Sequence, residues 1–409
     1  MKRYESYKDS GVKWLGEIPG HWEVKRLGSF FIERRVKVSD KDFAPLSVTK
    51  NGIFPQLENV AKSNDGDNRK LVRANDFVIN SRSDRKGSSG VSSFDGSVSL
   101  INIVLKPRNT VYPTFCNYLL KSIAFIEEYY RNGRGIVADL WTTRFDEMKI
   151  IKLAMPPKAE QTAIANYLNS VISKIDEAIS QQQKMIDLLN ERKQIIIQNA
   201  VTKGLDPNAK MKDSGVEWIG EIPEDWEVRR IKNSCKLINK KSKEDLPYIE
   251  LDNIESKSGK LLSYSNNRPD SICNHFEKGD ILFCKLRPYL AKCIIAGVEG
   301  KCSSELLVLR HFLGNQKYFQ YLLLSPKLID LINESTYGAK MPRANWSYIG
   351  NCIIPIPSMV EQKRIINYLD SFTSHIDSSI SQSNKMISLL QERKQIIIND
   401  VVTGKVKVS

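Results

Sequence analysis

The stretch KDSGVKWLGEIPGHWEVKRL at residues 8–27 returns as KDSGVEWIGEIPEDWEVRRI at residues 212–231. Each copy places glycine and proline beside a tryptophan, Trp22 or Trp226, where a large aromatic side chain can anchor a turn on a core. Two later segments are also duplicated in the same order: EQTAIANYL (160–168) with EQKRIINYL (361–369), and LLNERKQIII (188–197) with LLQERKQIII (389–398). The chain therefore contains the same frame twice.

Two inserts interrupt this frame, at roughly residues 28–155 and 232–355, and they align poorly with each other. Short apolar or alternating runs separated by Gly, Asn, Asp and Pro predict strands in both, for example over 98–106. A helical stretch is expected near the middle of each insert, at 115–131 and 318–334. We therefore expect two α+β domains of about 130 residues, and one scaffold that presents two different recognition surfaces.

A long helix should follow each insert. AMPPKAEQ (154–161) and PIPSMVEQ (355–362) place proline and then an acid where a helix begins. Apolar residues then recur at the three–four spacing of a coiled coil, interrupted by Gln182, Lys193, Ser383 and Lys394. The predicted coiled-coil core comprises Leu168, Ile175, Ile179, Ile186, Leu189, Ile196, Leu369, Ile376, Ile380, Ile387, Leu390 and Ile397.

These elements predict an α+β fold with a pseudo-twofold internal repeat. Two helices of about 40 residues would each be about 60 Å long, and the economical packing joins them to each other in an antiparallel coiled coil. The two inserts would then be separated by the helix pair. The expected boundaries are 1–155 for the first recognition domain, 156–203 for the first helix, 204–355 for the second recognition domain, and 356–409 for the second helix and tail.

The charge balance indicates a polyanionic partner. The 409 residues carry a formal net charge of +14, although their 41% hydrophobic and 26% charged content is ordinary for a globular protein. Nucleic acid is the leading candidate, ahead of an anionic membrane surface and of charge that serves solubility alone. The N-terminus has no apolar signal region, and the aliphatic runs are too short to span a bilayer. We therefore expect a cytoplasmic protein with no membrane partner.

The sequence contains no recognisable catalytic constellation. It lacks a GxxxxGK[ST] phosphate loop and the HExxH and GxSxG motifs, so we predict no catalytic residues. Six of the seven cysteines lie in the second half, but none forms a CxxC pair, and runs such as ILFCKL indicate thiols in apolar strands. We predict no metal site and no cofactor bound by this chain. The pattern is typical of a binding protein.

Basic residues cluster in both inserts beside glycines and short side chains. Lys and Arg neutralise phosphates, and Arg also forms the bidentate fork that reads guanine in the major groove. Each residue alone is more typical of a solvated charge or a phosphate contact, but the group favours DNA. The DNA-binding candidates are Arg82, Arg85, Lys86, Arg134, Lys285, Arg287, Tyr289, Lys292, Lys340 and Arg343. Arg69, Lys70 and Arg73 form a further basic group in the first insert.

The frame resembles the specificity subunit of type I restriction–modification enzymes. The resemblance rests on GEIPxxWEV, on the PPxxEQxxIxxYL entry to a long helix and on the LLxERKQIII helix with its VTxG-type end, and it covers essentially the whole chain. It implies two target-recognition domains, each reading one half of an asymmetric bipartite site in double-stranded DNA. It also implies that the coiled coil sets the spacer between the half-sites.

The same resemblance implies partners that carry the chemistry. Two adenine-N6 methyltransferase subunits would dock on the helices, and the nuclease–translocase restriction subunits would join them. S-adenosylmethionine, ATP and Mg would then belong to those subunits. The exposed helix flanks, with Glu191, Arg192, Glu392 and Arg393, are the candidate subunit interface. Pairing between solvated charges four residues apart on the helix explains any single one of them equally well.

Other functions compete with this interpretation. A stand-alone DNA-binding regulator would bind its site tightly without enzyme partners. A nuclease built from Glu/Lys triplets would cleave DNA with a metal ion, but the motifs for this are missing. A pure coiled-coil adaptor would not need two large, basic and dissimilar inserts.

Overall fold

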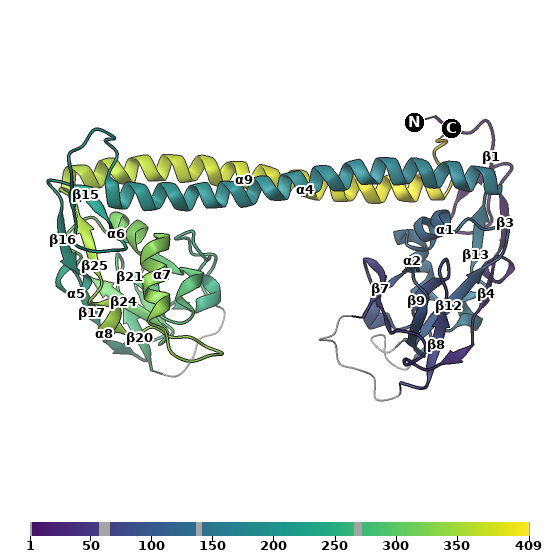
Figure 1. Cartoon of the computed structure of the whole chain (residues 1–409), viewed down its shortest axis with the longest axis horizontal. Coiled ribbons are helices and arrows are strands. Elements are labelled where there is room, and N and C mark those ends of the chain that lie inside the picture. Colours follow the sequence, from purple (N-terminus) through teal and green to yellow (C-terminus); the bar gives the residue numbers. More distant parts are fainter. Residues whose placement is uncertain (1, 57–65, 136–140, 266–271, 409) are drawn as a thin grey trace. The chain divides into compact units, whose positions relative to one another are not determined.

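The computed structural model describes residues 2–56, 66–135, 141–265 and 272–408, and the chain divides into two compact units. Unit 1 contains residues 1–182 and 385–409, and unit 2 contains residues 183–384 (Figure 1). Each unit thus combines one frame hairpin and one insert with half of each long helix. No helix among the described residues is long and apolar enough to cross a membrane.

Unit 1 is built from short strands and helices. Its strands are β1 (Tyr7–Asp9), β2 (Glu17–Pro19), β3 (Glu23–Arg26), β4 (Phe31–Glu33), β5 (Lys37–Val38), β6 (Leu46–Thr49), β7 (Gly52–Pro55), β8 (Arg69–Val72), β9 (Phe77–Asn80), β10 (Ser89–Val91), β11 (Gly96–Ser99), β12 (Asn102–Pro107) and β13 (Lys152–Met155). Its short helices are α1 (Pro113–Leu120), α2 (Ile123–Arg131) and α3 (Phe145–Met148), with 3-10 turns η1 (Leu27–Ser29) and η2 (Ser83–Arg85).

Unit 2 follows the same plan. Its strands are β14 (Met211–Asp213), β15 (Glu221–Pro223), β16 (Glu227–Arg230), β17 (Lys236–Ile238), β18 (Lys241–Ser242), β19 (Tyr248–Ile249), β20 (Cys273–Phe276), β21 (Ile281–Cys284), β22 (Cys293–Ile295), β23 (Gly300–Cys302), β24 (Leu306–Arg310) and β25 (Ile353–Ile356). Its short helices are α5 (Ile231–Ser234), α6 (Gln316–Leu323), α7 (Pro326–Glu334) and α8 (Trp346–Ile349), with 3-10 turns η4 (Leu251–Asn253) and η5 (Pro288–Leu290).

The two inserts share a topology that their sequences hide. The main sheet of unit 1 has the order β10-β9-β12-β4, and that of unit 2 has the corresponding order β22-β21-β24-β17. A second sheet, β11-β8-β5, corresponds to β23-β20-β18. The inserts differ locally, because unit 1 has a β6–β7 hairpin where unit 2 adds the parallel strand β19 beside β23. Similar cores therefore carry dissimilar loops.

Two expectations about the inserts need correction. The run at 98–106 forms two strands, β11 and β12, and not one. The helical stretches at 115–131 and 318–334 are each broken into two helices. Ser122 caps α2 by accepting a hydrogen bond from the Phe125 N–H, and Pro326 begins α7 where its missing N–H costs nothing.

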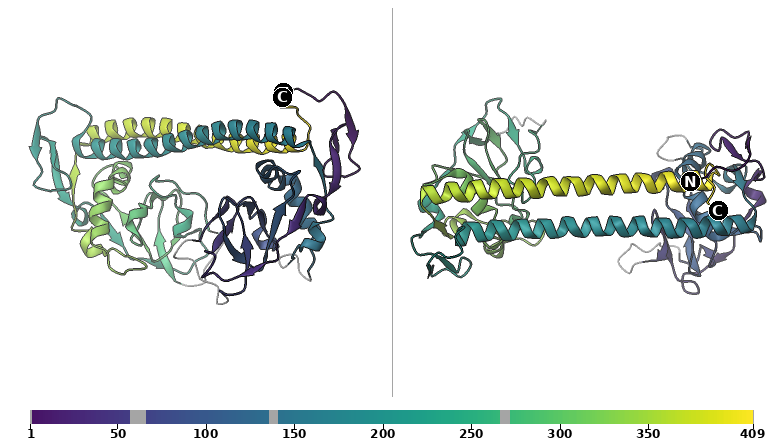
Figure 2. Two further views of the ribbon diagram at one scale, coloured as in Figure 1. Left: turned by 45° about the vertical axis from the view of Figure 1, so that its right-hand side comes forward. Right: turned by 90° about the horizontal axis from the view of Figure 1, so that it is seen from above.

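Two long helices, α4 (Lys158–Lys203) and α9 (Met359–Val402), pack antiparallel, which confirms the predicted fold class (Figure 2). In unit 1, Leu168 and Ile175 from α4 share one core with Ile397 and Val401 from α9. In unit 2, Ile197 and Val201 from the end of α4 share a core with Leu369 and other residues from the start of α9. The helix pair is thus also part of each domain core.

The duplicated hairpins dock onto the helix ends. Trp22 and Trp226 are buried, as predicted. Gly404 follows α9 with φ of +77° and lies against Pro19 and Trp22, and Gly204 follows α4 with φ of +72° and lies against Trp226. Glycine is required there because the chain leaves each helix in a left-handed conformation beside a bulky partner.

The two chain ends meet within unit 1. Lys2 and Lys407 form an antiparallel bridge in which the Lys407 N–H donates to the Lys2 carbonyl oxygen over 2.9 Å. The Tyr7 hydroxyl donates to the Lys405 carbonyl oxygen over 3.1 Å. The N and C labels therefore lie close to each other in Figure 1. The end of α9 thus meets the first hairpin in the way that the end of α4 meets the second.

The EQ motif explains how the frame holds the inserts. Gln161 is buried, accepts a hydrogen bond from the Tyr112 N–H over 2.8 Å and donates to the Thr110 carbonyl over 3.0 Å, at the start of α1. Gln362 is also buried and accepts from the Asn315 N–H over 2.8 Å, at the start of α6. Both glutamines therefore hold their insert through main-chain atoms.

Candidate nucleic-acid interface and subunit interface

In unit 2, loops from separate parts of the insert meet in one place. The segment after β21 and the segment before α8 pair through a bridge between Leu286 and Arg343, and Tyr337 bridges to Arg343 from the loop after α7. The Ala344 N–H donates to the Lys285 carbonyl over 2.9 Å. We call residues 285–292 and 337–343 the unit 2 junction.

Unit 1 has the same arrangement. Arg82, after β9, and Arg134, after α2, both bridge to Thr142, which precedes α3. The Ser83 N–H donates to the Trp141 carbonyl over 3.0 Å. We call residues 82–86, 133–135 and 141–144 the unit 1 junction. The structure thus brings the ten DNA-binding candidates into two clusters, four residues in the first junction and six in the second.

A buried ion pair positions the strand that leads to each junction. Asp76 precedes β9 and binds the Arg34 guanidinium with two hydrogen bonds of 2.6 and 3.0 Å. Asp280 precedes β21 and binds Arg310 with two of 2.7 Å. Both carboxylates are buried, and such bidentate pairs fix geometry as well as supplying energy. The aspartates are equivalent in the repeat, although Arg34 follows β4 and Arg310 ends β24.

In the unit 1 junction the cationic side chains are exposed and loosely paired. The Lys86 ammonium lies 2.7 Å from Glu127, and the guanidiniums of Arg85 and Arg134 lie 3.7 Å from Asp84 and Glu147. Surface pairs of this kind contribute only about 0–1 kcal/mol. A phosphate could therefore replace these carboxylates at little cost. Arg82 is exposed and has no carboxylate partner among the described residues.

In the unit 2 junction the basic side chains differ in whether the fold already pairs them with an acceptor. The Arg343 Nε lies 3.1 Å from both carboxylate oxygens of Glu305. The Lys292 ammonium donates to the Leu251 carbonyl over 2.6 Å, and only 11% of its side chain is exposed, so it is the candidate that the structure supports least. Lys285, Arg287 and Lys340 have no ion pair within the described part of the chain, and Tyr289 is exposed.

The structure adds residues that sequence reasoning missed. Tyr337 is 62% exposed and Met341 48% exposed in the unit 2 junction, and Trp141 is partly exposed in the unit 1 junction. Large apolar groups beside basic residues suit contact with bases or sugars. No periodic pattern marks them, and only their neighbours Lys340 and Arg343 could have drawn attention to this loop.

Two of the three residues in the further basic group of the first insert, Arg69 and Lys70, are structural. Arg69 is buried, donates to Ser97 Oγ over 2.8 Å and to the Ser97 carbonyl over 3.1 Å, and burial lowers its pKa. Lys70 donates to the Asn102 carbonyl over 2.8 Å. Arg73 pairs with Asp95. Arg69 and Lys70 are thus used inside the fold, whereas Arg73 is exposed, and charge clustering along the sequence does not distinguish the first two from exposed cations.

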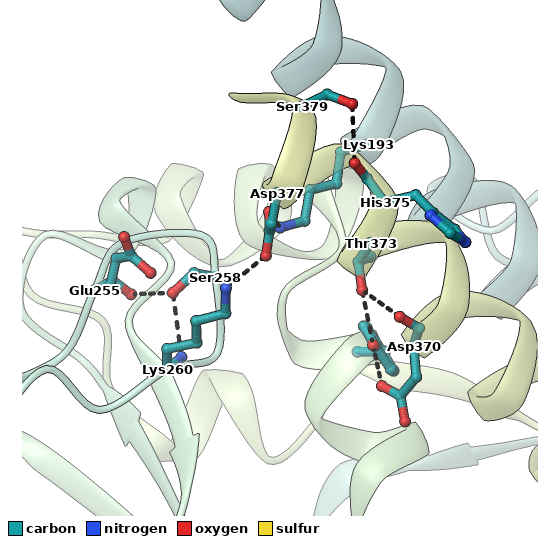
Figure 3. A network of polar contacts seen from close by, with 10 residues as sticks. Lys193, Glu255, Ser258, Lys260, Asp370, Thr373, His375, Asp377 and Ser379 are labelled. Atoms are coloured by element: carbon teal, nitrogen blue, oxygen red, sulfur yellow. Dashed lines mark hydrogen bonds and ion pairs between the residues drawn. The ribbon is translucent and has the colours of Figure 1, made fainter. Parts of the chain in front are cut away.

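Two of the four polar interruptions of the coiled-coil seam, Lys193 and Lys394, form ion pairs between the helices. In unit 2 the Lys193 ammonium lies 2.6 Å from Asp377, which also accepts a hydrogen bond of 2.5 Å from Lys260 of the insert (Figure 3). Lys193 is buried. Burial by itself would raise the pKa of Asp377, but the hydrogen bonds from both lysines outweigh it and hold that pKa below its usual value.

The equivalent pair in unit 1 is more open. Lys394 donates to the two carboxylate oxygens of Asp176 over 2.6 and 2.8 Å, and half of the Asp176 side chain is exposed. Among the described residues, no insert lysine joins this pair. The second insert is therefore tied to the helices by Lys260 in a way that the first insert is not.

The remaining predicted helix residues lie as follows. Six of the twelve coiled-coil core candidates are buried: Leu168, Ile175, Ile186, Leu369, Ile376 and Ile397. The other six are partly buried: Ile179, Leu189, Ile196, Ile380, Ile387 and Leu390. The interface candidates Glu191, Arg192, Glu392 and Arg393 are exposed, and the Arg192 guanidinium lies over the Phe372 ring, 5.6 Å from its centroid.

Each long helix also exposes an apolar stripe that the sequence analysis did not identify. In unit 2 the stripe consists of Met185, Leu188 and Ile195 on α4, each at least half exposed. In unit 1 the stripe consists of Met386, Leu389 and Ile396 on α9, at the equivalent positions of the repeat. Their three- and seven-residue spacing places each set on one helix face. Exposed apolar side chains gathered on one helix face are typical of a partner interface.

The described residues offer little for catalysis. No group of three or more His, Cys, Asp or Glu side chains among them is arranged to hold a metal ion. All seven cysteines are buried free thiols, and burial raises the pKa of several of them, Cys352 to about 11. Thiols with a raised pKa are poor nucleophiles at neutral pH.

Comparison with known proteins gives one consistent family. The family described as type I restriction modification DNA specificity domain matches residues 223–388. The MjaVIII specificity subunit of Methanocaldococcus jannaschii, a type I restriction enzyme subunit, is 26% identical over 98% of this chain and 97% of its own length. The EcoDI specificity subunit of Escherichia coli is 21% identical over 95% of this chain and 90% of its own.

Solved structures share the fold. A chain from a structural study of complex assembly and conformational transition in the type I R-M system superposes with a TM-score of 0.71 and 16% identity, covering 95% of this chain and 99% of that one. The HsdS subunit from Thermoanaerobacter tengcongensis gives a TM-score of 0.53 and 17% identity, covering 95% and 98%. Both likenesses extend over nearly the whole chain.

Proposed function

Because the chain belongs to the specificity subunits of type I restriction–modification enzymes, we propose that each of its two units reads one half of a bipartite DNA site. The chain is the non-catalytic DNA-specificity component of such a system. The basic side chains and exposed apolar side chains of the unit 1 and unit 2 junctions would contact the two half-sites.

The observation that carries this proposal is the repetition of the junction. The same three connections converge in both units, yet their side chains differ. In unit 1 they follow β9, follow α2 and precede α3, and in unit 2 they follow β21, follow α7 and precede α8. Arg82, Arg134 and Thr142 in one junction correspond to Leu286, Tyr337 and Arg343 in the other. A common backbone arrangement with different side chains is what reading two unlike half-sites requires.

We also propose that the two apolar stripes dock the methyltransferase subunits. Each stripe is flanked by charged interface candidates, Glu191 and Arg192 in one copy and Glu392 and Arg393 in the other. An apolar centre with a charged rim is the usual composition of a protein interface. The presence of two equivalent stripes supports two methyltransferase subunits, which restriction subunits would then join. S-adenosylmethionine, ATP and Mg would bind to those partners.

The test is to express the chain with its methyltransferase subunits and to map methylated adenines across a genome by single-molecule sequencing. We expect a split motif with one modified adenine in each half. Absence of methylation from an assembled complex would contradict the proposal.

The alternative, a stand-alone DNA-binding regulator, is separated by a binding measurement. A specificity subunit should bind its site at full affinity only with the methyltransferase present. Equal affinity for the motif with and without methyltransferase would favour the regulator.

A further inference from the structure

The unit 2 junction contains a strained backbone. Arg287 has φ of 49° and ψ of 63°, and Ala291 has φ of 45° and ψ of 51°, so two non-glycine residues adopt the left-handed conformation around η5. Arg287 also directly precedes Pro288, whose ring favours an extended conformation for the residue before it. Such outliers persist only where surrounding structure imposes them, and they concentrate at functional sites.

Hydrogen bonds from two directions impose this conformation. The Arg287 N–H donates to the Pro342 carbonyl over 2.7 Å, which ties the first junction segment to the second. Across the turn, the Leu290 N–H donates to the Arg287 carbonyl over 2.9 Å, and the Lys257 N–H donates to the Ala291 carbonyl over 3.1 Å. The Arg287 Cα is thus held in place while its side chain is exposed.

The guanidinium of Arg287 is not used by the fold. The junction has two arginines, and Arg343 is neutralised by Glu305. Arg287 has neither a carboxylate partner nor a cation–π contact within the described residues. Bidentate recognition of a base edge requires a Cα that is held in place and a planar guanidinium that the fold leaves unpaired. Lys285 and Lys340, which are also unpaired among the described residues, are compact point charges suited to phosphates.

We infer that Arg287 reads a guanine in the half-site of unit 2, through the O6 and N7 atoms exposed in the major groove. The inference rests on the proposed function, because it deepens the role of the same junction. The corresponding position in unit 1, three residues after the end of β9 as Arg287 is three after the end of β21, is Ser83. The two units thus differ at this point in the way that two unlike half-sites require.

The experiment compares R287K with the wild-type chain, each assembled with methyltransferase subunits, by genome-wide adenine methylation. Lysine keeps the charge and loses the fork. We expect the R287K motif to lose its preference at a single guanine of one half-site, by about 10-fold or more, while the other half-site stays unchanged. An R287K motif identical to that of the wild type would overturn the inference.

Two further variants separate base reading from folding and from charge. R287G relieves the strain, so we expect a Tm no lower than that of the wild type together with the same relaxed guanine. A lower Tm with an intact motif would show a structural role and overturn the inference. K340A should weaken binding evenly across sequences and reduce its salt dependence. Relaxation of the same guanine by K340A would also overturn it.

The wild-type complex distinguishes failure of the proposed function from failure of the role inferred for Arg287. If it methylates a split motif and R287K leaves that motif unaltered, the proposed function holds and the role of Arg287 fails. If the wild-type complex methylates nothing, the proposed function fails, and the inference fails with it.

Discussion

Lys193 and Lys394 occupy equivalent positions in the repeat, but their surroundings differ. Lys193 is buried, and its partner Asp377 also binds Lys260. Lys394 and its partner Asp176 are more exposed. A buried charge that loses its partner is costly, whereas an exposed pair contributes little. The same pair should therefore matter for stability in unit 2 and hardly in unit 1.

We expect Asp377→Asn to lower the free energy of unfolding by about 2 kcal/mol, because it leaves the buried Lys193 ammonium without a charged acceptor. The matched control Asp176→Asn should cost less than about 1 kcal/mol. Denaturant unfolding of both variants measures the difference. Equal losses for the two variants would show that burial of Lys193 is not the deciding factor.

The Asp377 pair should also make stability depend on pH. The pKa of Asp377 is lowered in the folded protein, so its contribution is complete above the unfolded value of about 4 and disappears as pH falls through the lower folded value. The stability difference between wild type and Asp377→Asn should therefore shrink on acidification from pH 6 towards pH 2. Unfolding curves at several pH values check this, and a constant difference would contradict it.

At the scale of elements, the helices were more predictable than the inserts. Heptad spacing identifies a helix because the apolar side chains that form the pattern are also those that pack in the core, as the buried Leu168 and Leu369 show. The common topology of the inserts was not predictable. It depends on main-chain pairing, and even the shared Asp76 and Asp280 bind arginines from different places in the topology, after β4 and at the end of β24.

Part of each candidate site was predictable as well. Basic residues in the loops were found, but their sequence could not separate exposed Arg82 from buried Arg69. Tyr337 and Met341 escaped notice because exposure of an apolar side chain in a loop leaves no periodic signal. The apolar stripes escaped for a different reason: heptad spacing assigns Leu189 to the seam, but it does not show that the neighbouring Leu188 forms an exposed apolar face with Met185 and Ile195.

The stripes give a prediction at this scale. Leu188→Glu places a charge on one stripe and Leu389→Glu on the other, and both leucines are more than half exposed. Each single variant should fold normally and bind one methyltransferase subunit in place of two, and the double variant should bind none. Native mass measurement of the complexes gives the stoichiometry. Retention of two subunits by the single variants would exclude the stripes as docking sites.

At the scale of the whole molecule, α4 and α9 are the elements that run through both units. We expect that inserting seven residues into each, after Gln182 and after Asn384, preserves the heptad register of the seam. The insertion adds about 10 Å of helix. The methylated motif should then gain a longer unread spacer with unchanged half-sites. A change in either half-site sequence would contradict this role for the helices.

The hydrogen bonds of Gln161 and Gln362 to main-chain atoms have a consequence for how such chains can diversify. Gln161 contacts an N–H and a carbonyl at the start of α1, and Gln362 contacts an N–H at the start of α6. Every amino acid except proline can supply these groups. These contacts of the frame therefore depend little on the amino-acid sequence of the insert. Recombination could exchange one insert and leave the other untouched, and a small stock of inserts would yield a combinatorial repertoire of paired specificities.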